Sequence, residues 1–174
     1  HRVDRRQRQM CIRDSIIIGL IIYSAIQAYY AIAGNFESKS SYHPHTKPVI
    51  LGILICIFIE IIIGTEIRGG LDMSRKENPL IEGVILLKML GPFKYMHTIL
   101  GFTLLGLTIY LWKIVNDIKF ISSSFMVNSV NFIMGLIITQ IILGEALVFL
   151  EVKPLMQLFH MWFSSLLVGL SVAS

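Results

Sequence analysis

The sequence predicts an all-α, polytopic membrane protein with about five transmembrane helices. Of its 174 residues, 55% are hydrophobic and only 15% are charged, whereas charged residues make up about a quarter of an ordinary soluble domain. A helix needs about 20 mainly apolar residues to cross the hydrocarbon core. Five stretches reach or approach that length: 16–33, 48–66, 93–112, 126–149 and 155–174. We expect the last four to form a four-helix bundle.

The first fifteen residues, HRVDRRQRQMCIRDS, differ in composition from the rest of the chain. Their five arginines and two aspartates give a local charge of +3 out of a total of +4, so the remainder is nearly neutral and no nucleic-acid partner is implied. The segment has no apolar periodicity, and its MCIRDS resembles a translated sequencing adapter. We interpret residues 1–15 as a non-native leader, with a native basic tail as the alternative. Without Cys11, only Cys56 is left, which argues against a disulfide.

The first apolar stretch, 16–33, is followed by a polar connection that runs to Pro48. His43 and His45 lie in this connection without an acidic or cysteine companion, so a solvated loop is favoured over a metal site. The chain has no initiator methionine, and its last apolar run stops without a polar flank. We therefore expect both ends to be truncated.

The second apolar stretch, 48–66, leads into the longest connection, 67–91. Gly69 and Gly70 permit a tight turn just past the expected end of the helix. Further on, PLIEGVILLKML (79–90) alternates apolar pairs with single charges. This pattern predicts a short amphipathic helix that lies on the membrane surface.

Two helical hairpins, 48–113 and 126–174, resemble each other. In each, the outgoing helix ends in a similar apolar motif, and the returning helix begins with an aromatic-rich turn that carries a histidine. Internal repeats in membrane proteins often place a site at the interface between the repeats. The matching segments are EIIIG (60–64) with KYMHTILG (94–101), and QIILG (140–144) with QLFHMWFS (157–164).

His97 and His160 occupy equivalent places in this repeat. His97 comes five residues after Pro92 and His160 six after Pro154, so both lie about 8–9 Å along helices that run in parallel. An interhelical hydrogen bond is the simplest role for a single buried histidine in a membrane. A pair at matched depth instead favours a ligand shared between the two imidazoles.

Each of the two histidines has a small residue four positions later on the same helical face, Gly101 and Ser164. This spacing leaves room for a flat group between the helices. We infer a bis-histidine haem without covalent attachment, because no Cys-x-x-Cys-His motif is present. A zinc site would need further ligands at the same level. Apolar side chains expected around the haem are Tyr95, Met96, Phe159, Met161 and Trp162.

Glu60 lies inside an apolar run, where a charge at mid-bilayer costs about 2.5–3.5 kcal/mol on insertion scales. A position near the interface, protonation or pairing would each relieve this cost. Its counterpart in the second hairpin is the neutral Gln140, which favours structural hydrogen bonding over proton transfer. Asn128, Asn131 and Gln140 recur at helical spacings, and we expect them to link neighbouring helices.

Arg68 follows the second apolar stretch together with Glu66 and Asp72. Its guanidinium group could pair with a carboxylate group of a haem. It could equally form a local salt bridge with either acidic neighbour, and both interpretations stay open.

These motifs resemble the C-terminal half of the haem A synthase family, whose members act in cytochrome oxidase assembly. The likeness covers roughly 48–174, through IEIIIGTEIRGGLD, FKYMHTILGF and the second hairpin. Members of the two-half type contain two related four-helix bundles, so 16–33 would be the last helix of a missing N-terminal half. The resemblance implies that His97 and His160 ligate haem b, as metal and cofactor ligands, while the substrate site and the proposed catalytic glutamate belong to the missing half.

The family oxidises a methyl group of haem O to the formyl group of haem A, and electrons pass through the haem b half. The resemblance therefore implies a haem A synthase-like oxidoreductase whose full-length form takes haem O as substrate. This part would bind haem b and relay electrons, and alone it would be inactive. We expect a multi-pass protein of the cell membrane, in a prokaryotic plasma membrane, and leave homo-oligomerisation open.

Two features depart from the family pattern. The family often has His-Arg where this chain has His97 and Thr98, so a contact with a haem propionate would fall to Arg68 or Lys94. The resemblance also places the connection 67–91 outside the cell. The distribution of lysine and arginine does not support that orientation.

Two other functions are compatible with the residues. A non-enzymatic b-type membrane cytochrome would use the same histidine pair to pass electrons, without an oxidation of its own. A transporter fragment would use Glu60 as its coupling carboxylate and would bind no haem. A complete upstream sequence separates the first from a synthase, and a reducible haem spectrum excludes the second.

Overall fold

In the computed structural model, the described residues are 43–78, 80–81, 85, 90–117, 124–150 and 154–173, with scattered positions between 17 and 28. Every regular element among them is a helix. All four long helices are apolar enough to cross a membrane, which confirms the predicted all-α, multi-pass fold. The helices are α2 (Thr46–Glu77), α4 (Phe93–Val115), α5 (Ser124–Phe149) and α6 (Pro154–Ala173).

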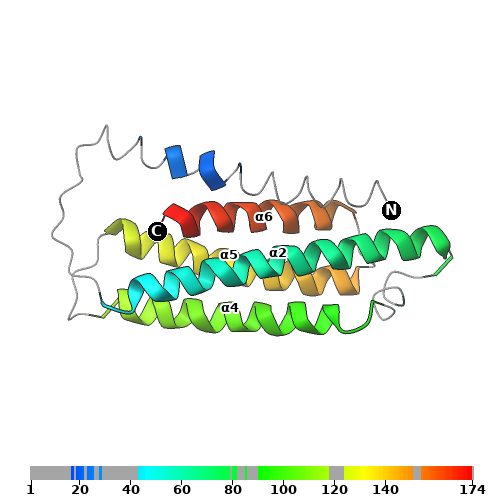
Figure 1. Cartoon of the computed structure of the whole chain (residues 1–174), viewed down its shortest axis with the longest axis horizontal. Coiled ribbons are helices and arrows are strands. Elements are labelled where there is room, and N and C mark those ends of the chain that lie inside the picture. The colour runs from blue at the N-terminus through cyan, green and yellow to red at the C-terminus, as the bar shows by residue number, and fades with distance from the viewer. Residues whose placement is uncertain are drawn as a thin grey trace.

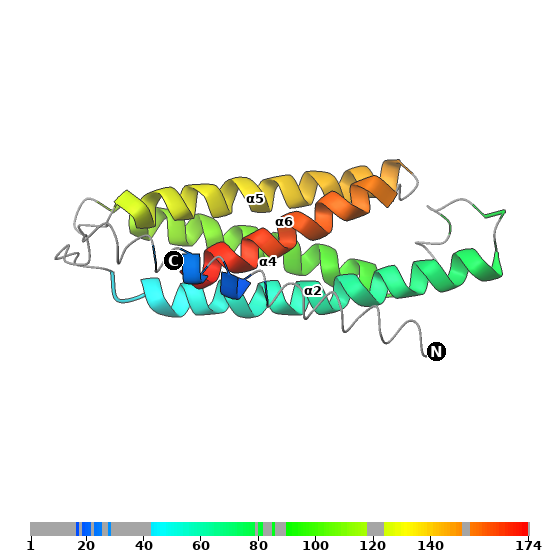
Figure 2. The same cartoon turned by 90° about the horizontal axis from the view of Figure 1, so that it is seen from above.

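The four helices form an antiparallel bundle (Figure 1). Both α2 and α5 pack against α4 and α6, so α4 and α6 lie on one diagonal of the bundle and α2 and α5 on the other (Figure 2). Successive helices run in opposite directions, which makes α4 and α6 parallel. The predicted pair of hairpins therefore places the two returning helices opposite each other across the centre.

Prolines mark the beginning of three helices. Pro48 lies in the first turn of α2, and Pro154 is the first residue of α6. At these positions the missing N–H group costs no intrahelical hydrogen bond. Pro92 directly precedes α4, and it follows Gly91, whose φ of 67° is a left-handed conformation that glycine adopts without strain.

Helix α2 is longer than predicted, because residues 67–77, expected in a connection, are helical. Gly69 and Gly70 make no turn, since a glycine inside a helix costs only about 1 kcal/mol relative to alanine. The prediction took the end of the apolar run as the end of the helix, but α2 continues past that point. It ends at Glu77. The next residue, Asn78, has φ −133° and ψ 70° and directly precedes Pro79, whose ring disfavours a helical residue ahead of it.

The added length carries α2 out of the hydrocarbon core. Its 32 residues rise about 48 Å, whereas the core is about 30 Å thick. Figure 1 shows the C-terminal end of α2 extending past the other three helices. The charged residues that follow the apolar run thus lie on a projecting helix.

Some sequence predictions fall outside the described residues. These are the leader 1–15, most of the span 16–33 and most of the amphipathic helix 79–90. The described positions within 16–33 are helical. Gly19 lies against α6, where a Cβ atom built on it would be 3.2 Å from Cγ1 of Val168. The division into leader, last helix of a missing half and bundle stays a prediction.

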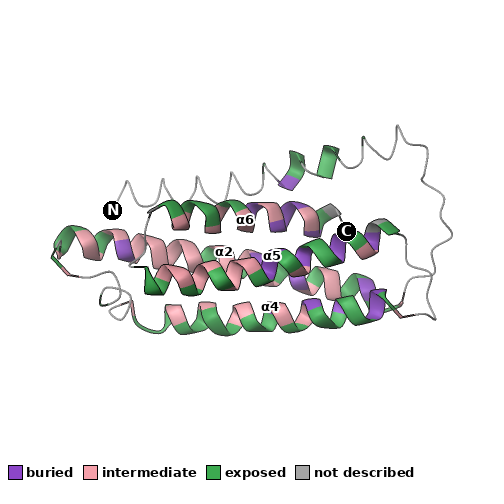
Figure 3. Ribbon diagram, turned by 180° about the vertical axis from the view of Figure 1, so that it is seen from behind, coloured by how far each residue is buried: buried purple, intermediate pink, exposed green. Residues whose placement is uncertain are grey.

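Most of the buried residues lie in one half of the bundle (Figure 3). The buried cluster comes from the N-terminal halves of α2 and α5 and the C-terminal halves of α4 and α6, which meet at one end. At the other end, the described segments 58–70, 93–103, 138–149 and 155–164 contain no buried residue. A small second cluster lies just beyond them, where the buried Leu71 of α2 packs against Ile67, Ile81, Leu90 and Leu147. The buried cluster consists of Ile53, Ile57, Leu104, Leu111, Ile114, Val115, Met126, Val130, Ile133, Leu136, Ile137, Leu167 and Val168.

We predict that Ile133→Ala destabilises the protein and that Ile138→Ala on the same helix does not. Ile133 is 1% exposed, whereas Ile138 is 45% exposed on the outer surface. Ile133→Ala should lower the free energy of unfolding by about 1–2 kcal/mol. This is at or below the smallest values for core truncations in soluble proteins, because a helix that separates from the bundle in lipid keeps apolar surroundings. Denaturant unfolding in detergent measures both variants. Equal stabilities would show that α5 is not packed as described.

Candidate functional site

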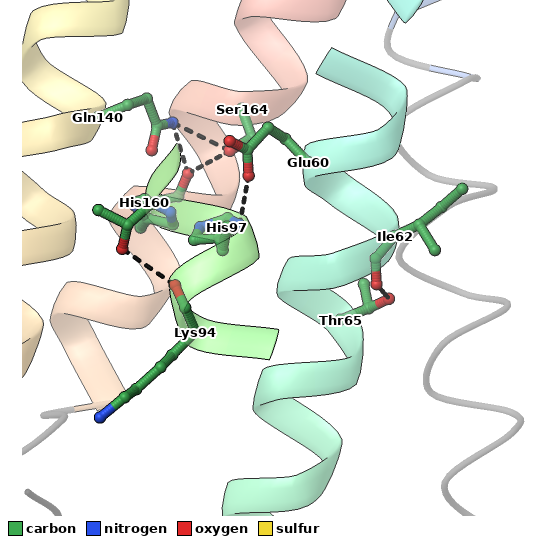
Figure 4. A network of polar contacts seen from close by, with 9 residues as sticks. Glu60, Ile62, Thr65, Lys94, His97, Gln140, His160 and Ser164 are labelled. Atoms are coloured by element: carbon green, nitrogen blue, oxygen red, sulfur yellow. Dashed lines mark hydrogen bonds and ion pairs between the residues drawn. The ribbon is translucent and has the colours of Figure 1, made fainter. Parts of the chain in front are cut away.

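His97 of α4 and His160 of α6 face each other across the loosely packed half of the bundle (Figure 4). Their ring centroids are 6.3 Å apart, and the ring planes are inclined at 60°. Both residues are partly buried. The two diagonal helices thus bring the two imidazoles together at one level.

The repeated glycines pack against these imidazoles in the same way in both hairpins. A Cβ atom built on Gly64 would lie 3.5 Å from Cε1 of His97, and one on Gly144 would lie 3.8 Å from Cε1 of His160. Each histidine ring therefore lies beside the glycine that ends the repeat motif of its own hairpin. A long side chain at either glycine would compete with the ring for the same space.

Glu60, one helical turn before Gly64, lies beside the ring of His97. Its carboxylate makes an ion-pair contact with Nδ1 of that ring (Figure 4), and the two side chains are 13% and 30% exposed. A Cβ atom on Gly101 would lie 3.4 Å from Oε1 of Glu60, so the absence of a side chain there makes room for the carboxylate. Sequence reasoning identified Glu60 as a polar exception but not His97 as its partner. Glu60 begins the repeat motif of the hairpin that carries His97, and this shared position in the repeat could have predicted the contact.

Gln140 takes the corresponding place in the second hairpin, but it binds the backbone. Its Nε2 donates to the carbonyl oxygen of His160 at 2.7 Å and to Oγ of Ser164 at 3.0 Å. Ser164 Oγ in turn donates to the same carbonyl at 2.9 Å. Nε1 of Trp112 donates to Oδ1 of Asn131 at 3.0 Å. Gln140 and Asn131 therefore link neighbouring helices, as predicted.

Unpartnered buried polar atoms gather around the two histidines. Among the described residues, Nδ1 of His160 and Oε1 of Gln140 have no hydrogen-bond partner. The same holds for Nδ1 of His97 and both oxygens of Glu60 apart from their mutual contact. Buried polar atoms are normally satisfied, and the one further exception in the described segments is Oγ of Ser171. This half of the bundle therefore contains buried hydrogen-bond donors and acceptors that the described side chains do not satisfy.

The separation of the two rings suits a metal ion held between them. A histidine nitrogen lies about 2.0–2.1 Å from a bound metal and roughly 1.1 Å from its own ring centre, so two opposed imidazole ligands have centroids about 6–6.5 Å apart. The observed separation is 6.3 Å. No group of three or more metal-ligating side chains occurs among the described residues. Two opposed histidines without further protein ligands are compatible with a haem iron, whose other four ligands come from the macrocycle.

Arg68 reaches from α2 to α6, where its guanidinium group contacts Sδ of Met161. Met161 directly follows His160 in the sequence, so Arg68 reaches the same turn of α6 that carries this histidine. Since residue 68 is helical, Glu66 two positions earlier faces another direction and is not placed to pair with it. Asp72, four positions later, shares its face, and that alternative stays open.

Most of the side chains expected to wall a haem are exposed. Met161 is partly buried, whereas the other four are exposed. The rings of Phe159 and Trp162 pack edge to face with centroids 5.9 Å apart. The exposed fractions are 62% for Tyr95, 52% for Met96, 37% for Phe159 and 58% for Trp162.

The chain was compared with known proteins. A family model described as COX15-CtaA, cytochrome oxidase assembly protein, matches residues 5–172. The chain belongs to this family. The match confirms the resemblance to haem A synthases and assigns the chain to cytochrome oxidase assembly. No curated protein and no solved structure matched it in the same comparisons.

Membership of the cytochrome oxidase assembly family agrees with the four membrane-spanning helices of the described segments. It does not identify ligand-binding residues. The functions of His97, His160 and Arg68 therefore depend on the geometry given above.

We predict that Gln140 and Ser164 stabilise the bundle of this family member as a coupled pair. Gln140→Leu removes the interhelical donor, and the free energy of unfolding should fall by about 0.6–1.7 kcal/mol, the range measured for such bonds in membrane proteins. Ser164→Ala should cost less in the Gln140→Leu background than alone, because the two side chains share a hydrogen bond.

The control is Thr139→Val. The Thr139 hydroxyl donates to the carbonyl of Gly135 within its own helix, so the loss of this bond should leave the α5–α6 contact intact. A double-mutant cycle measured by unfolding in detergent tests the pair. Strictly additive effects would contradict the coupling.

Proposed function

We propose that this chain is the haem b-binding part of a haem A synthase-like membrane enzyme, with His97 and His160 as the axial ligands of one haem. The observation that carries the proposal is the 6.3 Å separation of the two imidazoles, in a part of the bundle where the described segments 58–70, 93–103, 138–149 and 155–164 contain no buried residue. Membership of the cytochrome oxidase assembly family supports it.

The chain's own residues hold and orient the two ligands. Gly64 and Gly144 allow the rings to lie close to α2 and α5. Gln140 fixes the backbone of α6 at His160 through its bond to the carbonyl oxygen. A haem iron bound there supplies one-electron transfer. The two hairpins thus act as a rigid frame for an electron-transfer site.

Three further residues contribute to the space around the haem. Arg68, which contacts Met161 on the turn of α6 that carries His160, provides a positive group for a haem carboxylate. Gly101 and Ser164 are the small residues one turn beyond the ligands. They keep that part of α4 and α6 free of large side chains.

In the full-length enzyme, haem O is the substrate, and its methyl group is oxidised to the formyl group of haem A. This part relays electrons between an external partner and the substrate haem, which binds in another half of the protein. We place the enzyme in a prokaryotic plasma membrane. A chain limited to these helices binds haem b without catalysing the oxidation.

We predict that the purified chain, reconstituted with haem in detergent, gives a six-coordinate low-spin spectrum with a sharp alpha band on reduction. His97→Ala and His160→Ala should each lose the low-spin signal, because an axial nitrogen is missing. His45→Ala, a histidine in the connection before α2, is the control and should match the wild type. A wild-type chain that takes up no haem would refute the proposal.

We predict that Gly64→Leu weakens haem binding strongly, while Gly52→Leu on the same helix does not. A leucine at position 64 meets the ring of His97, since even a Cβ atom lies 3.5 Å from it, whereas a Cβ atom on Gly52 has no neighbour within 4 Å. Spectroscopic titration should show that the affinity for haem falls at least about tenfold, as is typical when a residue that supports a metal ligand is replaced. Equal affinities would mean that His97 does not hold the haem from this position.

A further inference from the structure

Glu60 is a mostly buried acid to which the proposed haem site gives no role. It lies inside an apolar run of α2 with a side chain that is 13% exposed. Its carboxylate contacts Nδ1 of His97, while Gln140 at the repeat-related position binds the backbone of His160 and leaves that ring's Nδ1 without a partner among the described residues. The two histidines are therefore supported differently.

We propose that Glu60 is a positioning residue that makes His97 the stronger electron donor of the two haem ligands. Its carboxylate accepts a hydrogen bond from the Nδ1–H group of His97, so Nε2 is the nitrogen that is left for the iron. The inference rests on the proposed haem site.

The physical basis is the effect of a carboxylate on a ligating imidazole. A ligating histidine commonly donates its other ring N–H group to a carboxylate, which fixes the tautomer and ring orientation and raises the basicity of the ligand. A more basic ligand and a nearby negative charge both favour ferric over ferrous iron. Hydrogen bonding in the second shell is accordingly one of the means by which a protein sets a haem potential. Glu60 should therefore lower the midpoint potential of the haem.

The surroundings of Glu60 hold the carboxylate in this place. Gly101 leaves the space that its Oε1 fills, and Gly64 lies one turn further along the same face of α2, beside the same imidazole. Helices α2 and α4 pack against each other. The carboxylate thus lies against Gly101 and contacts the ring of His97, and the same ring lies against Gly64.

A purely structural link between α2 and α4 is the competing explanation. Such a link would affect the stability of the bundle and leave the haem potential unchanged. Potential and stability therefore separate the two roles.

The test uses the full chain with haem bound, in detergent, and three variants. Glu60→Leu removes both the acceptor and the charge, while Glu60→Gln keeps the shape and a neutral acceptor. Glu145→Gln is the matched control, because it makes the same chemical change at an exposed position on α5. For each protein, haem titration in both oxidation states and a potentiometric titration are recorded, with circular dichroism as a check on folding.

Glu60→Leu should bind ferric haem at least about tenfold more weakly than the wild type, with a smaller loss for ferrous haem. Each tenfold difference between the two losses raises the midpoint potential of this one-electron couple by about 59 mV. Glu60→Gln should raise the potential while keeping the low-spin spectrum, so it serves if Glu60→Leu fails to fold. Glu145→Gln should match the wild type.

A folded Glu60→Leu or Glu60→Gln variant with the wild-type midpoint potential would overturn the inference and leave the haem site standing. A wild-type chain without low-spin haem would overturn the proposed function and this inference with it.

Discussion

The histidine-bearing half of this bundle depends on the need of polar side chains in a membrane to find partners inside the protein. Lipid offers no hydrogen bonds, and it gives no hydrophobic drive for helices to associate. Glu60 meets this constraint through the ring of His97, and Gln140 through the backbone of His160. Each contact joins an outgoing helix to the returning helix of its own hairpin. Together they set the register at which the two imidazoles meet.

The two ends of the bundle are stabilised by different forces. One end is closed by interdigitated apolar side chains such as Ile57, Leu111, Val130 and Ile137, which are almost fully buried. At the other end, the level of the two histidines has polar contacts and small residues, and only a small cluster around Leu71 lies beyond it. A level with few buried side chains can accept a rigid flat ligand without first breaking many side-chain contacts. The packed end then preserves the helix arrangement whether or not a ligand is present.

Much of this fold could be predicted from the sequence, because hydropathy reports directly on membrane burial. The four described spans lie where the apolar runs predicted them. The predicted length of α2 was wrong, because hydropathy marks only the end of the apolar run, whereas residues 67–77 are a polar extension of the same helix. The residues that end the helix were also wrongly predicted. Gly69 and Gly70 were expected to permit a tight turn, whereas α2 continues through them to Glu77 and ends two residues before Pro79.

The part of the site that follows from the repeat of the two hairpins could be predicted from the sequence. Matching the two hairpins placed His97 opposite His160 and matched Glu60 with Gln140. It could not show which partner each polar side chain chooses, because that depends on rotations of the helices that spacing alone does not fix. For the same reason it did not predict that the exposed rings of Phe159 and Trp162 pack against each other.

The repeat is most informative where it is broken. Four positions correspond between the hairpins: an acid or amide, a glycine, a histidine and a small residue. A glutamate in one hairpin and a glutamine in the other place a carboxylate on only one side of the histidine pair. Two equal half-sites would contain two equivalent imidazoles, whereas here one imidazole has an acidic partner and the other has none among the described residues. The asymmetry comes from a change of one side-chain group on a common frame, so the backbone geometry and the electronic character of the site can vary independently.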